Sequence, residues 1–196
     1  MPKKRTNPYR IPVSIRDYDL KDLKAEATTK MVLQEWAIIL AAIASFSDIT
    51  TEHLLSYWDQ VNNAATQVDD FESAQKWLSR IQDMASCSLP LRRVNLHVKT
   101  KADINKLQRH LLSNAKATAF AMIVEAMITQ EVMEEEDLKT VIRKSVSMNE
   151  EIDEGRISVQ DLVDMLQDEY SIRLEILEGR TVLHRTVLEE ESSLML

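Results

Sequence analysis

The chain has 196 residues, of which 44% are hydrophobic and 29% charged, a balance typical of globular rather than disordered proteins. It contains only two glycines and four prolines, too few for the many tight turns of an all-β fold. Its single cysteine, Cys87, excludes an intramolecular disulfide framework. We therefore expect long helices joined by short polar connections.

The net charge of −8 is distributed unevenly. Residues 131–178 contain 15 acids and 5 bases, whereas residues 1–16 contain five bases and no acid. Three prolines also lie within residues 1–12, so we predict an extended basic arm there. The acidic side chains are typical of solvated helix faces, but they also suit a basic protein surface. The five bases are Lys3, Lys4, Arg5, Arg10 and Arg16.

Two segments that lie 85 residues apart resemble each other. Residues 73–83 read SAQKWLSRIQD and residues 158–168 read SVQDLVDMLQD. Upstream, residues 25–28 (AEAT) match residues 115–118 (AKAT) at an offset of 90. Because the matching blocks occur in the same order, the sequence indicates a tandem duplication. We assign a first helical unit to residues 13–90 and a second to residues 91–175.

Each unit is predicted to contain three helices, since its apolar residues recur at spacings of three and four. In the first unit, Thr50 or Thr51 is expected to cap the second helix. Gly155 is expected in a turn that requires positive φ. The expected helices are 17–46, a segment starting at Thr50 or Thr51, and 71–84 in the first unit, and 102–133, 135–149 and 158–169 in the second.

The first helix of each unit is the expected centre of the fold. Trp36–Ala44 and Ala117–Ile128 are apolar almost all the way round, and a helix of this kind is buried on more than one side. We expect the two helices to pack on each other about a pseudo-twofold axis, with the other helices outside.

Two stretches alternate between apolar and polar residues, which is typical of strands. One is 93–99. The other runs from 172–176 through Glu178-Gly179-Arg180 into 181–188, which predicts a β-hairpin, with a continuing helix as the alternative. We assign residues 176–196 to this hairpin and tail. The predicted fold class is thus mainly all-α, with two tandem three-helix units packed by their first helices and a small C-terminal hairpin.

Several segments resemble short uncharacterised all-α proteins of Firmicutes phages and prophages. The chain opens on Pro2–Thr6 (PKKRT), similar to the basic arm of these proteins. Val98–Ile104, Ile157–Leu162 and Glu169–Ile172 resemble their later segments. The second unit differs, because Arg92-Arg93 stands where the basic arm would be. The resemblance implies a mobile-element origin and implies no activity.

No pattern in the sequence predicts catalysis, a metal or a cofactor. The chain has no G-x-S-x-G, P-loop or G-x-G-x-x-G motif, and no histidine has a ligand partner three or four residues away. It has no apolar leader, and its longest apolar run, 36–44, is too short to cross a bilayer. We expect a non-enzymatic protein in the cytoplasm of a bacterial host, without a membrane partner.

The first functional hypothesis is a protein-binding module, namely a phage-encoded regulator or inhibitor of the anti-defence or anti-CRISPR type. Its acidic side chains would meet a basic surface of a host or phage protein. Five methionines of the second unit would add an adaptable apolar surface, although methionine also fills cores. The acids are Glu134, Glu135, Glu136, Asp137, Asp161, Asp164 and Asp168, and the methionines are Met122, Met127, Met133, Met148 and Met165.

The alternative hypothesis is a DNA-binding regulator or accessory protein that uses the basic arm. Three-helix units can place a helix in the major groove. The third helix of the second unit, however, carries Asp161, Asp164 and Asp168, which phosphate would repel. At most the first unit, with Lys76 and Arg80, would therefore contact DNA.

Overall fold

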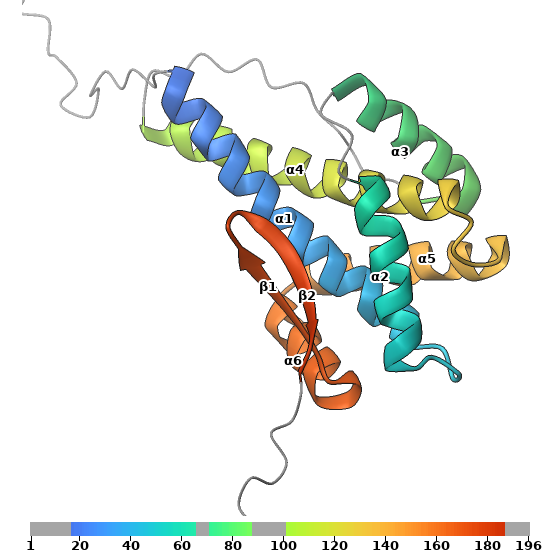
Figure 1. Cartoon of the computed structure of the whole chain (residues 1–196). Coiled ribbons are helices and arrows are strands. Elements are labelled where there is room, and N and C mark those ends of the chain that lie inside the picture. Colours follow the sequence, from blue (N-terminus) through green and yellow to red (C-terminus); the bar gives the residue numbers. More distant parts are fainter. Residues whose placement is uncertain (1–16, 66–70, 88–100, 187–196) are drawn as a thin grey trace, which may run out of the picture.

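The computed structural model describes residues 17–65, 71–87 and 101–186 (Figure 1). These residues form a mainly helical fold with a small two-stranded hairpin near the C-terminus, which confirms the predicted fold class. The basic arm, the alternating stretch 93–99 and residues 187–196 lie outside the described residues. The elements are α1 (Asp17–Ala44), α2 (Thr51–Ala65), α3 (Phe71–Ala85), α4 (Lys101–Thr129), α5 (Glu135–Asp153), α6 (Val159–Tyr170), β1 (Ile172–Leu177) and β2 (Arg180–Arg185).

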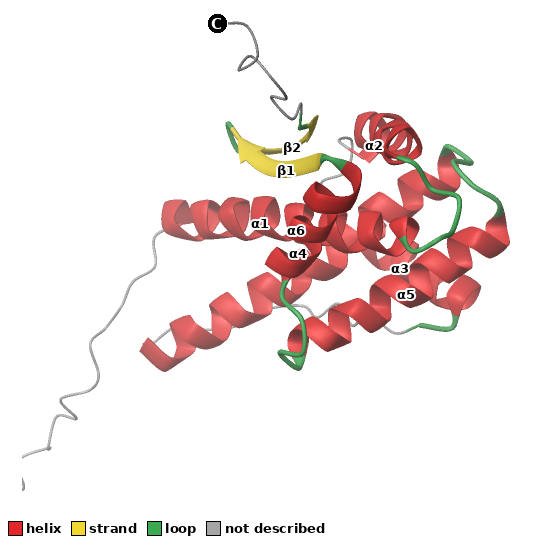
Figure 2. Ribbon diagram, turned by 90° about the horizontal axis from the view of Figure 1, so that it is seen from below, coloured by secondary structure: helices red, strands yellow, loops and turns green. Residues whose placement is uncertain are grey.

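The two long helices, α1 and α4, pack against each other more extensively than any other pair of elements, as expected. Residues 36–43 of α1 are each at most 2% exposed, and Ala121, Ile123 and Val124 of α4 are completely buried. Both helices begin on the same side of the molecule, where their N-terminal halves diverge (Figure 2). Their C-terminal halves are enclosed by the remaining helices, which explains why no face of either segment is polar.

Each outer helix crosses over and packs on the central helix of the opposite half of the chain. We expected the other helices outside the central pair without assigning them to either helix, and α2 and α3 lie mainly on α4, whereas α5 and α6 lie mainly on α1 (Figure 1). The two sets of contacts are reciprocal, which is the relation found in twofold interfaces. Since both central helices are apolar all round, this crossing covers each of them with helices from the opposite half.

The core is shared between the halves as a consequence. One hydrophobic cluster takes buried side chains from all six helices of the described chain and from β1. Trp36 and Trp58 are in contact within it, with ring centroids 4.4 Å apart, whereas Trp77 is only partly buried. Other members of the cluster include Ala37, Leu54, Leu78, Phe120, Leu138, Leu166 and Ile172.

The helix bounds repeat with a nearly constant spacing. The starts of α4 and α5 follow those of α1 and α2 by 84 residues, and the start of α6 follows that of α3 by 88. The ends of α4 and α6 follow those of α1 and α3 by 85 residues, and the end of α5 follows that of α2 by 88. Ser86 and Ser171, also 85 apart, both have left-handed φ values, 54° and 53°. This spacing is what a tandem duplication predicts, and it disagrees with the offset of 90 suggested by residues 25–28 and 115–118.

Side-chain caps define where several helices begin. At the start of α2, the backbone N–H of His53 donates to Thr50 Oγ1 at 3.4 Å, and that of Thr50 donates to His53 Nδ1 at 3.3 Å. At the start of α6, Ser158 and Asp161 form a capping box. Thr50 and Ser158 therefore satisfy backbone donors that the first turns of these helices leave free.

The C-terminal hairpin covers the side of α1 that faces away from α4 and α5 (Figure 2). Leu177 pairs with Arg180 across a two-residue turn, in which Glu178 and Gly179 both have positive φ. This is the turn geometry that matches the twist of paired strands. On β1, Ile172 and Leu174 are buried against the helices.

Two helical segments are long and apolar enough to cross a membrane by length and composition alone. Within the described residues these are Ala25–Ala44 of α1 and Asn105–Thr129 of α4. The first window contains the run 36–44 that we judged too short from the sequence, and the second lies in another helix. Core helices of globular folds have the same properties, and α1 and α4 form the core here.

A shared core has a measurable consequence for Leu166, which is 1% exposed on α6. We expect Leu166→Ala to destabilise the protein by roughly 2–5 kcal/mol, because it leaves a cavity in the core. All three tryptophans lie in the first half of the chain. In urea unfolding of the variant, tryptophan fluorescence and far-UV circular dichroism should therefore shift to the same lower midpoint. An unchanged fluorescence midpoint would show that the halves unfold independently.

Candidate functional site

A groove of about 770 Å³ opens where the end of α4 turns into α5. It lies between elements of both halves, since α2 and α3 form one side and α4 and α5 the other. Its lining combines apolar side chains with several carboxylates. The lining residues are Tyr57, Arg80, Met84, Met127, Ile128, Glu131, Val132, Met133, Glu134, Glu135, Asp137 and Leu138.

Three methionines contribute to the apolar part of the groove. Met127 is 1% exposed and belongs to the core, whereas Met84 and Met133 are only partly buried. Met84 comes from α3 and Met133 from the connection before α5, so the helix crossing brings them together. Unbranched methionine side chains adapt to differently shaped partners. Met148 and Met165, which we also expected at a binding surface, pack instead beside Leu162, between α1, α5 and α6.

Part of the acidic run at the start of α5 has a structural role. Glu135, Glu136 and Asp137 occupy the first turn, where carboxylates interact favourably with the helix dipole. Lys139 Nζ lies 2.7 Å from a carboxylate oxygen of both Glu135 and Glu136. The hydrogen bond from Lys139 lowers the pKa of Glu136. These contacts give Glu136, which does not line the groove, a structural role at the start of α5. They also partly neutralise the charge of Glu135.

The remaining charges leave the groove acidic. Of its lining residues, four are acids and one, Arg80, is a base. Arg80 Nη1 lies 2.7 Å from Glu125 Oε1, and the Glu125 side chain is only 15% exposed. Because Arg80 is already paired with Glu125, it does little to offset Glu131, Glu134 and Asp137.

The second predicted acidic group lies elsewhere. Asp161, Asp164 and Asp168 belong to α6, which packs mainly on α1 and the hairpin. Asp161 accepts hydrogen bonds from the backbone N–H and hydroxyl of Ser158, and the first of these lowers its pKa. Asp164 accepts from Gln160 at 2.7 Å. The structure thus divides the predicted acidic residues, and only Glu134, Glu135 and Asp137 line the groove. The predicted DNA-binding bases lie outside the described residues.

Tyr170 ties together three helices at the corresponding junction of α6, α1 and α2. Its hydroxyl donates to the carbonyl of Ala44 at the end of α1, and its carbonyl accepts from Thr51 Oγ1 at the start of α2, both at 2.8 Å. The residue 85 positions earlier, at the end of α3, is Ala85. An alanine side chain cannot donate the first of these hydrogen bonds, and the groove lies at this junction of α3, α4 and α5.

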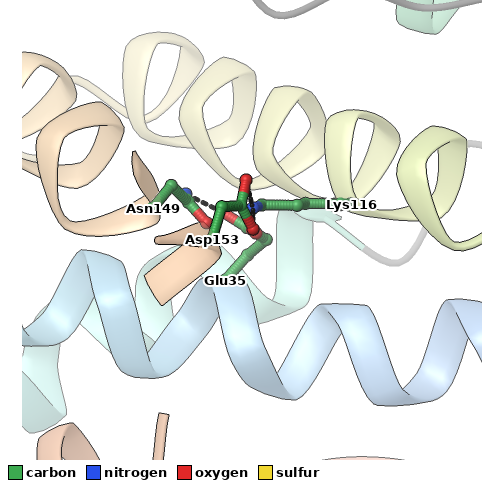
Figure 3. Close-up of polar contacts among 4 residues, drawn as sticks. All are labelled: Glu35, Lys116, Asn149 and Asp153. Carbon is green, nitrogen blue, oxygen red and sulfur yellow. Dashed lines mark hydrogen bonds and ion pairs between the residues drawn. The ribbon is translucent and has the colours of Figure 1, made fainter. Parts of the chain in front are cut away.

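A second unusual feature is a buried polar cluster at the junction of α1, α4 and α5 (Figure 3). Glu35 on α1 is completely buried, and Asn149 Nδ2 donates to its Oε2 at 3.0 Å. Beside it, Lys116 Nζ donates to both carboxylate oxygens of Asp153, at 2.9 and 3.0 Å. Ser145 on α5 is also buried, without a hydrogen-bond partner for its hydroxyl.

Burial determines the protonation of Glu35. Desolvation raises its pKa from 4.5 to about 7, against the opposing effects of the Asn149 hydrogen bond and the Lys116 charge. A carboxylate with such a pKa resembles a general base. The side chain is fully enclosed by helices, however, so a substrate cannot reach it in this arrangement. Among the described residues, no group of three His, Cys, Asp or Glu side chains is placed to hold a metal ion.

Sequence reasoning missed several residues of both features. Tyr57, Arg80 and Met84 join the groove only because helices of the first half cross to the second. Glu131 was included in the charge count but not chosen as a binding residue. Glu35 did carry a signal, since it is the only charged residue between Met31 and Ala44.

Comparisons with protein-family models, with curated proteins and with solved structures find no significant match to this chain.

The burial of Glu35 predicts an unusual dependence of stability on pH. Between pH 4.5 and about 7 the folded protein binds a proton at Glu35 that the unfolded chain releases, so stability falls as pH rises. The full effect of this shift is about 3 kcal/mol. In urea unfolding at pH 5 and pH 8, Glu35→Gln should remove most of this loss and be more stable than the wild type at pH 8. An equal pH dependence in both proteins would contradict the assignment.

Proposed function

We propose that this chain is a non-enzymatic protein-binding module whose binding site is the groove between α3 and the start of α5. The observation that carries the proposal is the groove itself, in which partly buried methionines lie beside Glu131, Glu134 and Asp137. An apolar centre with a charged rim is the usual anatomy of a protein interface. A basic surface on the partner would complement the carboxylates.

Binding would then be the activity, and the module would act as a regulator or inhibitor of its partner. The resemblance of its segments to proteins of Firmicutes phages supports a phage origin and a partner in the bacterial cytoplasm. A host protein, including one with a role in defence against phage, is the partner class that we propose. An inhibitor of the anti-CRISPR type that covers a basic nucleic-acid-binding surface would fit the charge of the groove.

DNA binding is a second candidate, favoured by the five bases and no acids of residues 1–16. Contact between α3 and DNA has less support than we expected, because Arg80 on α3 is paired with Glu125. Binding through the arm alone predicts retention on duplex DNA that weakens with salt and is lost when residues 1–10 are deleted.

Site-specific photo-cross-linking in a lysate of a Firmicutes bacterium tests the protein-binding proposal. A photo-reactive amino acid at Met133 in the groove should form an adduct of one defined mass. The same group at Asp168, on the acidic face of α6, serves as the matched control. We expect an adduct at Met133 and none at Asp168. An adduct only at Asp168 would move the site to α6, and no adduct at either position would contradict the proposal.

A further inference from the structure

We infer that the groove binds a cationic amphipathic helix of the partner protein, and that Glu131 is the residue that selects for its positive charge. This inference rests on the proposed function and assigns a chemistry to the occupant. Glu131 occupies a local structure that does not favour a glutamate.

Glu131 lies in the turn that ends α4. The backbone N–H of Glu131 donates to the carbonyl of Ile128, and that of Val132 donates to Met127, both at 3.3 Å. This pair of hydrogen bonds is the Schellman motif, which requires a left-handed residue and usually contains glycine there. The φ of Glu131 is accordingly +48°.

The same motif closes α5, where the left-handed residue is a glycine. Gly155, with a φ of +72°, donates to Ile152, while Arg156 donates to Glu151. At the end of α4, Glu131 therefore occupies a position where glycine fits without strain. It also places a negative charge at the negative end of a helix dipole. Glu131 is unfavourable for folding on both counts.

No ion pair among the described residues compensates for this. Glu131 is exposed, and within the described residues its carboxylate forms no ion pair. A residue that opposes its local structure and lies in a concave surface is a candidate for function. Because it lines the groove, its carboxylate faces an occupant that would supply the missing cation.

The walls of the groove indicate the shape of the occupant. All of its lining residues come from helices or from the connection between α4 and α5. The groove therefore offers no strand edge to an extended peptide, and recognition must rely on side chains. An amphipathic helix presents a row of apolar side chains along one face, and methionine-lined grooves suit such a helix. Its polar flank would meet Glu131, Glu134 and Asp137.

The hairpin turn provides a matched control. Glu178 is also an exposed acid in the left-handed conformation, with a φ of 51°. It belongs to the turn between β1 and β2 and does not line the groove. Replacing either residue by glycine relieves the same backbone strain and removes one negative charge. Only Glu131→Gly should affect the groove.

The probe is a synthetic helical peptide of leucine and lysine, about four turns long, with all leucines on one face. One control peptide has glutamate in place of lysine, and another has the same composition in scrambled order. Binding to the full chain is followed by NMR of methyl-labelled methionines. We expect Met84 and Met133 to shift with the lysine peptide alone, while Met148 and Met165 remain unchanged. The affinity should fall as salt is added.

The two glycine variants then test Glu131 itself. Both Glu131→Gly and Glu178→Gly should raise the midpoint of urea unfolding. Glu131→Gly should weaken binding of the lysine peptide roughly three- to tenfold, as expected for loss of one charge contact, whereas Glu178→Gly should leave it unchanged.

The outcomes separate this inference from the proposed function. Equal affinity of Glu131→Gly and wild type for the lysine peptide would overturn the role of Glu131. Binding of the glutamate or scrambled peptide as tightly as the lysine peptide, or no shift at Met84 and Met133, would overturn the cationic helix. In either case, an adduct at Met133 in the cross-linking experiment would still support a protein partner of another chemistry.

Discussion

The contact between α1 and α4 is the interaction on which the other elements depend. Both helices are apolar on every side over much of their length, so neither can be stable with one face in water. Packed side by side, they still leave two apolar surfaces to be covered. The outer helices cover them by crossing, which places α2 and α3 on α4 and α5 and α6 on α1. The groove lies at one of the junctions that this crossing creates.

The two halves of the chain have diverged at these junctions. On one side Tyr170 ties the end of α6 to Ala44 and Thr51, and the hairpin adds further cover to α1. On the other side Ala85 leaves α3 without such a tie. If the chain arose by duplication, an ancestral homodimer would have had two identical junctions. Joining the copies in one chain would have allowed one junction to gain the Tyr170 contacts while the other kept the groove.

Local features were largely predictable from the sequence, because they depend on neighbours in the chain. Helix periodicity, the caps at Thr50 and Ser158, the turn at Gly155 and the hairpin around Gly179 all follow from local backbone preferences. The contact between the two first helices followed from their lack of a polar face. The crossing of the outer helices did not, since the apolar stripe of a helix does not specify which of two similar partners it covers.

Prediction of the candidate site from the sequence was limited in the same way. Glu134, Glu135 and Asp137 were predicted because they are adjacent in sequence, but the grouping with Asp161, Asp164 and Asp168 was based on charge alone, and α6 lies elsewhere. Met84 and Arg80 reach the groove through a tertiary contact. The conflict at Glu131 becomes visible only with its φ value, because glutamate is unremarkable in a sequence until the backbone around it is known.

The crossed arrangement also determines how the chain can be divided. Residues 1–90 alone would leave α1 without α5 and α6, and residues 91–196 alone would leave α4 without α2 and α3. Neither fragment could cover its own central helix, yet each carries the helices that the other lacks. Mixing the two fragments should therefore restore the fold by complementation. Each half of this protein thus completes the fold of the other and is not a separate domain. The groove exists only when both halves are present.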